Sequence, residues 1–188
     1  NTPEFKLGRE GEVIVREWLK QQGYVLLPAS LIEQGGAPML NGKNLKLILP
    51  DNLSWKEGQP GWVEVKTKSH PTLHNNPPHR WEHGFPLRQW RAYCQVQEIT
   101  KIPVSLAVLE LETAILLIGS LSTLARGERL SEINKEPHIF LNRLNPNGRS
   151  DFERWYSIDL SLPTPIQPMA ERTQTQGPAP IQGQPRLL

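Results

Sequence analysis

LPDNLSWKEGQPGWVEVK, residues 49–66, is the strongest indication of the fold of this chain. It places Asp51 before a polar turn, and it places Glu64 and Lys66 two residues apart in an apolar run. Because side chains alternate between the two faces of a strand, Glu64 and Lys66 share one face and the neighbouring valines share the other. The pattern predicts an acid, a hairpin, and then an acid and a lysine on one strand. A polar face that only serves solubility is the alternative interpretation.

The segments around this stretch alternate between helical and extended patterns. Apolar spacing and a glycine stop indicate a first helix before it, and a second helix and further strands follow it. The expected elements are a helix at 10–22, a buried strand at 24–27, a loop at 30–44, a strand at 45–49, a hairpin turning at 57–58, a loop at 70–84, a helix at 88–99, a strand at 104–111, its antiparallel partner at 114–118, a short helix at 120–126 and an edge strand at 152–160.

Pro50-Asp51, then twelve residues, then Glu64-Val65-Lys66 resembles the PD-(D/E)xK nuclease superfamily, which includes restriction enzymes and archaeal Holliday-junction resolvases. The helix that opens at Gly8-Arg9-Glu10-Gly11-Glu12 resembles the first helix of the resolvases, with Glu12 in the place of its acidic residue. The order of helix, hairpin, E-x-K strand, helix and strand agrees with that fold. The resemblance implies an α/β fold with a mixed central β-sheet flanked by helices, a restriction-endonuclease-like core.

Phosphodiester hydrolysis needs the residue types that this pattern supplies. Mg²⁺ prefers oxygen ligands and keeps several waters, so the carboxylates of Asp51 and Glu64 with a substrate phosphate make a sufficient site. Glu12 would be a third acid, and the resemblance implies that the carbonyl of Val65 also reaches the metal. Lys66 would position the attacking water and offset the developing negative charge. The expected activity is an endonuclease that hydrolyses DNA with Mg²⁺ or Mn²⁺.

Each candidate residue also has a structural interpretation. Asp51 follows a proline and could be only a turn residue. Glu12 could be only the helical partner of Arg16, with Glu10 the better-placed acid. Gln89 resembles the glutamine that many members of the superfamily carry on the helix after the E-x-K strand, and we count it with the catalytic residues. Its alternative is a surface position on that helix.

Basic and aromatic residues near the motif predict contacts with nucleic acid. The segment His70–His83 is expected to be a loop over the strand that touches DNA or RNA, because basic groups bind phosphates and aromatic rings stack on bases. A merely polar loop is the alternative. The predicted contacts are Lys68, Arg80, Trp81, Arg88 and Arg91.

Histidines and the single cysteine do not predict a zinc site. His70 and His74, and again His79 and His83, are four residues apart, but prolines interrupt both segments and no cysteine cluster completes a tetrahedral site. Cys94 excludes an internal disulfide, is expected in the core, and fits a reducing cytosol.

Length and composition predict one domain at 1–162, which the resemblance implies is nuclease-like, and a Pro- and Gln-rich, disordered tail at 163–188. The formal charge of +2 means that DNA contacts need a local basic patch. The sequence shows neither an apolar run of membrane-spanning length nor a signal peptide, so we expect a cytoplasmic protein with no membrane partner. A homodimer, a larger nucleoprotein assembly and a longer parent chain all stay open.

Two other functions compete with a nuclease. A non-catalytic DNA-binding or replication-accessory module could keep the fold, although it would need none of Asp51, Glu64 and Lys66. An unrelated α/β scaffold with chance motifs would be favoured if Asp51 and Glu64 lay far apart in space.

Overall fold

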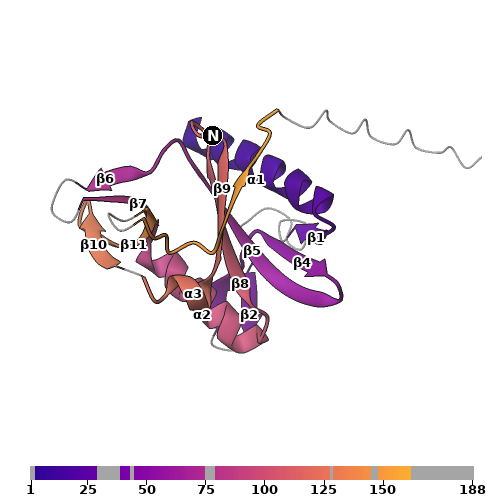
Figure 1. The fold of residues 1–188 in the computed structure, drawn as a ribbon. Helices are drawn as coiled ribbons and strands as arrows, with labels where there is room; N and C mark the ends of the chain where they lie inside the picture. The colour runs from indigo at the N-terminus through magenta and orange to yellow at the C-terminus, as the bar shows by residue number, and fades with distance from the viewer. Residues whose placement is uncertain are drawn as a thin grey trace, which may run out of the picture.

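A computed structural model describes residues 3–28, 39–42, 45–74, 79–127, 129–144 and 148–161 (Figure 1). The segment 163–188 lies outside these residues, so its disorder and the domain boundary before it stay predictions. The described helices are α1 (Pro3–Gln21), α2 (Leu87–Thr100) and α3 (Leu121–Leu124). The described strands are β1 (Val25–Pro28), β2 (Met39–Gly42), β3 (Leu45–Ile48), β4 (Asn52–Lys56), β5 (Gln59–Lys68), β6 (Thr72–His74), β7 (Arg80–Pro86), β8 (Val104–Glu110), β9 (Ile115–Ser120), β10 (Arg129–Ile133), β11 (Glu136–Leu144) and β12 (Arg154–Ser157). None of the described helices is long and apolar enough to cross a membrane.

The central sheet has six strands in the order β1-β4-β5-β8-β9-β12. β5 and β8 run parallel, and all other neighbouring pairs in this sheet run antiparallel. A parallel pair needs a long crossover, and the chain between β5 and β8 contains β6, β7 and α2. The predicted fold class is therefore confirmed: the protein is α/β, with a mixed central sheet flanked by helices.

The two faces of the central sheet carry different layers. Val63 and Val65 of β5 pack with Ile14, Val15 and Leu19 of α1, which confirms the predicted alternation along the strand. The opposite face packs against α2, α3 and a second sheet. Figure 1 shows α1, in indigo, and α2 on opposite sides of β5 and β8. The acidic motif thus lies on the face that looks toward α2.

The N-terminal elements differ from the prediction in their extent and burial. α1 begins at Pro3, seven residues before the predicted start, and ends before Gly23, whose φ of 84° suits a helix stop. β1 is an edge strand, with Val25 68% exposed, so the prediction of a buried strand is wrong. The loop predicted at 30–44 is wrong for Met39–Gly42, which pair with β3 in a separate hairpin.

The second sheet has the order β10-β11-β7-β6. The loop predicted at 70–84 is wrong for β6 and β7, which pair antiparallel, while residues 75–78 lie outside the described part. Glu82 and His83 of β7 are buried, and each has a charged or polar partner, Arg129 and Glu110 respectively. The hydrophobicity pattern did not predict β7 as a strand, because two of its buried residues are polar and have partners in the interior.

Candidate active site

Asp51 and Glu64 meet where the hairpin ends. β4 pairs with β5 as far as Asn52 opposite Val63, so in the described structure the rest of β5 pairs with β8 alone. There the Oδ2 of Asp51 accepts a hydrogen bond from the backbone N–H of Val65 at 2.8 Å. The backbone N–H of Asp51 donates to Oε2 of Glu64 at 3.2 Å. The Asp51 carboxylate therefore binds the backbone of β5 where a neighbouring strand would otherwise pair. Asp51 and Glu64 are neighbours as a result.

Glu64 is the buried centre of the site. Its side chain is only 4% exposed, and its Oε1 lies 2.5 Å from the ammonium group of Lys66. The hydroxyl of Tyr93, on α2, donates to the same oxygen at 2.5 Å. Tyr93 was not among the residues predicted from the sequence. The only available signal was its position on the buried face of the helix, since a buried tyrosine hydroxyl usually has a polar partner.

Burial and the neighbouring carboxylates both disfavour the charged forms of the acids. Burial, and then the charges of Glu64 and Glu12, raise the pKa of Asp51 to about 8, although the N–H of Val65 opposes this. Burial lowers the pKa of Lys66, but the charge of Glu64 and its hydrogen bond outweigh burial and raise that pKa overall. Lys66 therefore stays protonated in a pocket with an excess of negative charge.

Glu12 lies close enough to interact with Asp51, Glu64 and Lys66, because α1 packs directly on β5. A Cβ atom added at Gly11 would lie 1.9 Å from Oγ1 of Thr67, so only a glycine permits this approach. Burial raises the pKa of Glu12, Arg16 lowers it, and Glu64 raises it. Glu12 thus interacts electrostatically with both Arg16 and Glu64, and its role as a metal ligand stays a prediction. Glu10 instead lies 3.9 Å from Lys6 in an exposed pair.

Gln89 lies beside the site, on the first turn of α2. It is half-buried and lines a small pocket together with Lys66, Phe85 and Tyr93. Its catalytic role and its alternative as a surface residue of the helix both stay predictions. Cys94, further along the same helix, is exposed, so the expectation that it belongs to the core is wrong.

The predicted nucleic-acid contacts fall into separate groups. Lys68 is partly buried, donates to the carbonyl of Gly84 at 3.2 Å, and has its pKa lowered by burial and by Lys66. Arg88 and Arg91 are exposed on α2, the helix that carries Tyr93. The remaining two, Arg80 and Trp81, belong to the second sheet, where Trp81 is 42% exposed.

Trp81 is part of an apolar row across the second sheet. It lies opposite Leu144 of β11 on one side and Leu73 of β6 on the other, and both leucines are also exposed. The structure therefore presents Trp81 on a sheet, with aliphatic neighbours, rather than on a polar loop.

The described residues contain no group of three or more His, Cys, Asp or Glu side chains arranged to hold a metal. His83 is buried against Glu110, with 2.9 Å between Nε2 and Oε1, and His70 contacts Glu112 at the surface. A hard divalent ion needs fewer protein ligands, because one or two carboxylates plus waters and phosphate suffice. Asp51 and Glu64 fit that requirement. Burial, and then the charges of Glu64 and Glu12, raise the pKa of Asp51 to about 8, and a bound cation would favour its ionised form.

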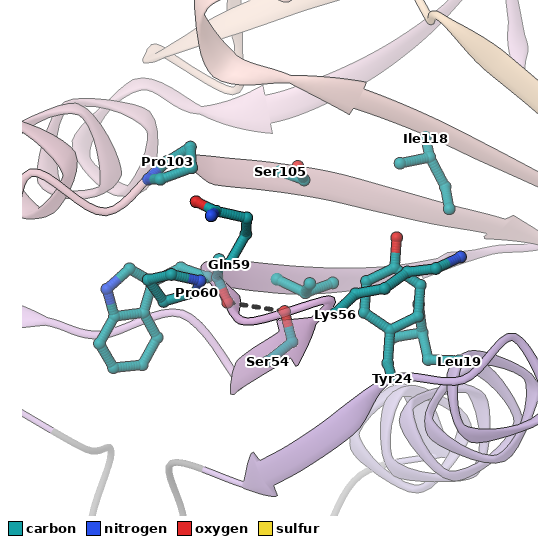
Figure 2. A pocket seen from close by; sticks show the side chains of 12 residues that line it. Leu19, Tyr24, Ser54, Lys56, Gln59, Pro60, Pro103, Ser105 and Ile118 are labelled. Carbon is teal, nitrogen blue, oxygen red and sulfur yellow. Dashed lines mark hydrogen bonds between the residues drawn. The ribbon is translucent and has the colours of Figure 1, made fainter.

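A larger pocket of about 230 Å³ opens elsewhere, between the turn of the β4–β5 hairpin and the C-terminal part of α1 (Figure 2). Ser54, Lys56 and Tyr24 are among its lining residues, and Oγ of Ser54 donates to the carbonyl of Gly61 at 2.7 Å. Its lining contains no carboxylate. This pocket lacks the groups for metal-assisted hydrolysis, so the acidic cluster is the candidate site.

Comparison with protein-family models and with curated proteins finds no match. Comparison with solved structures finds a Holliday junction resolvase, Hjc, of the archaeal hyperthermophile Archaeoglobus fulgidus. The sequences are 12% identical, the TM-score is 0.47, and the match covers 76% of this chain and 90% of that chain. At this TM-score and identity, the match assigns no residue of this chain a role.

Proposed function

We propose that this protein is a metal-dependent nuclease that hydrolyses phosphodiester bonds in DNA. The observation that supports it best is the junction of Asp51 with Glu64 at the end of the hairpin, with Lys66 on the same carboxylate. Two acids and a lysine in one partly buried site favour phosphoryl chemistry over a chance motif. A scaffold that only binds DNA has no need to hold such a repulsive cluster together.

Asp51 and Glu64 would hold Mg²⁺ or Mn²⁺, with Glu12 and the carbonyl of Val65 as further ligands. A bound divalent ion supplies a Lewis acid that polarises a phosphoryl oxygen and lowers the pKa of a bound water. With its pKa near 8, Asp51 holds a proton on its carboxyl group in neutral, metal-free solution and loses it when a cation takes its place.

Lys66 acts through its charge in this proposal. Its raised pKa keeps the ammonium group protonated, so it cannot serve as the general base. A fixed positive charge beside the reacting phosphate instead stabilises the negative charge that develops in the transition state, and its protons can orient the attacking water. Gln89, which lines the same small pocket, would contact the phosphate from the other side of Lys66.

DNA would approach over α2 and the second sheet. Arg88 and Arg91 would contact phosphates near the site, Lys68 would add charge behind Lys66, and Arg80 with Trp81 would contact the strand further away. A homodimer or larger nucleoprotein assembly and a cytoplasmic location stay predictions.

Cleavage of labelled duplex, single-stranded and branched DNA tests the proposal. Activity is expected with Mg²⁺ or Mn²⁺ and not with a chelator. Asp51→Ala and Glu64→Ala should abolish cleavage, and Lys66→Ala should lower kcat by about a hundredfold or more, the scale of a lost electrostatic stabiliser. Glu10→Ala is the matched control, because Glu10 is an acid of α1 in an exposed ion pair. Full activity of Glu64→Ala would exclude this mechanism, and DNA binding without cleavage in any metal would favour the non-catalytic module.

A further inference from the structure

Glu64 is held by groups from three parts of the chain. Its Oε1 receives both the Lys66 ammonium group of the same strand and the Tyr93 hydroxyl of α2, each at 2.5 Å. Its Oε2 receives the backbone N–H of Asp51 at 3.2 Å. One oxygen therefore has two strong donors, and these two donors differ in how firmly they are fixed.

Tyr93 is fixed by packing. α2 buries Trp90, Tyr93 and Val96, and the tyrosine ring belongs to the core under the central sheet, with 4% of its surface exposed. A ring in such a core has one rotamer, so its hydroxyl points at Glu64 whatever happens in the site. Lys66 has a long flexible side chain that is 23% exposed, and it can turn toward a substrate.

We infer that Tyr93 is a positioning residue that holds the Glu64 carboxylate in its ligating orientation when Lys66 turns to the phosphate. This inference rests on the proposed function, in which the same lysine must serve the transition state. A phenol suits the role because it is a neutral donor that adds no charge to the site. A bond from a second charged group would weaken the attraction of Glu64 for a cation.

A purely structural role is the competing explanation, since a buried hydroxyl needs a partner in any case. The two roles differ in what the loss of the hydroxyl changes. A structural bond affects only the free energy of unfolding. A positioning bond also affects the binding of a cation by Glu64, and the effect is larger when Lys66 cannot hold the carboxylate.

Calorimetric titration of the full chain with Ca²⁺, without DNA, separates these roles. Tyr93→Phe should raise the Kd for Ca²⁺ about tenfold, which corresponds to ~1.4 kcal/mol. In a Lys66→Met background the same substitution should raise the Kd by more than it does alone. Tyr24→Phe is the matched control, because Tyr24 packs near α1 in the other core, and its Kd should equal that of the wild type.

The outcomes distinguish this inference from the proposed function. If the wild type binds no Ca²⁺, the metal site fails and takes this inference with it. If the wild type binds Ca²⁺ and Tyr93→Phe leaves the Kd unchanged in both backgrounds, the positioning role alone is overturned.

A second measurement covers the case in which Tyr93→Phe does not fold. The chain has three tyrosines, so the Cζ resonance of Tyr93 in ¹³C-tyrosine-labelled wild-type protein can be assigned by elimination with Tyr24→Phe and Tyr156→Phe. Addition of Ca²⁺ should shift this resonance, because the cation withdraws charge from the oxygen that the hydroxyl binds. A resonance that stays in place while Ca²⁺ binds would overturn the inference.

Discussion

The carboxyl group of Asp51 lies between an amide that stabilises its charge and two carboxylates that oppose it. The N–H of Val65 lowers its pKa, while burial and the charges of Glu64 and Glu12 raise the pKa to about 8. At this residue the requirements of catalysis and stability conflict. The folded, metal-free protein disfavours the ionised form that the proposed metal site requires.

Asp51→Asn is therefore expected to stabilise the metal-free protein at high pH. The folded pKa of about 8 exceeds the ordinary value of 3.8, so stability is lost as the pH rises between these values, and a neutral amide avoids that loss. The gain should be at least ~1 kcal/mol at pH 8 and should vanish near pH 4. Urea unfolding at both pH values, in chelator, measures it. Glu10→Gln should show no such gain. The prediction is wrong if the stability of Asp51→Asn relative to the wild type is the same at both pH values.

Two elements create the opening in which the site lies. β4 starts at Asn52 and leaves the second half of β5 without a partner on that side in the described structure. α1 then lies against β5 at Gly11, where Thr67 fills the space that a side chain would need. Strand length and helix approach, rather than any single acid, bring Glu12 toward Glu64.

Gly11→Ala should push α1 away from β5. The new Cβ would lie 1.9 Å from Oγ1 and 2.9 Å from Cβ of Thr67, so we expect a loss of ~1–3 kcal/mol in the free energy of unfolding. Gly8→Ala is a matched control on the same helix, because nothing lies within 4 Å of its Cβ and alanine favours helix by ~0.5–1 kcal/mol. Adding Thr67→Ala should recover part of the loss. Chemical denaturation of the three variants tests this, and equal stability of Gly11→Ala and Gly8→Ala would contradict it.

At the scale of the whole molecule, the central sheet and the second sheet share a buried ionic contact. Glu110 of β8, in the central sheet, binds His83 of β7 and Arg143 of β11, both in the second sheet. Burial raises the pKa of Glu110, but the hydrogen bonds of His83, Arg143 and Thr113 outweigh it and lower that pKa to about 2. The same second sheet carries Trp81 and supplies Phe85 to the small pocket beside Lys66.

Glu110→Gln should loosen the second sheet. Removing the charge leaves Arg143 partly buried without its anion, which costs ~3 kcal/mol near neutral pH. The folded pKa of Glu110 lies below the ordinary value of 4.5, so this stabilisation is present above pH 4.5 and is lost as the pH falls toward 2. The free energies of unfolding of the wild type and of Glu110→Gln should differ at pH 7, and this difference should become small at pH 2.5. Glu112→Gln, at an exposed pair with His70, should change stability little, and a gap that persists in acid would contradict the assignment.

Features that arise between residues close together along the chain could be predicted from the sequence. The hairpin between Asp51 and Glu64, the shared face of Glu64 and Lys66, and the helices on either side could all be predicted. Turn residues and the alternation of strand side chains act over a few residues, so their signal is contained in a short stretch.

Contacts between residues that are far apart in the sequence became visible only in the folded structure. Tyr93 contacts Glu64 across 29 residues, and His83 of the strand β7 forms a buried hydrogen bond with Glu110 across 27 residues. Hydrophobicity along the sequence cannot show that a polar residue will be buried, because the partner that makes its burial possible comes from another element. For the same reason the sequence predicted the acids of the site but not the tyrosine that holds one of them.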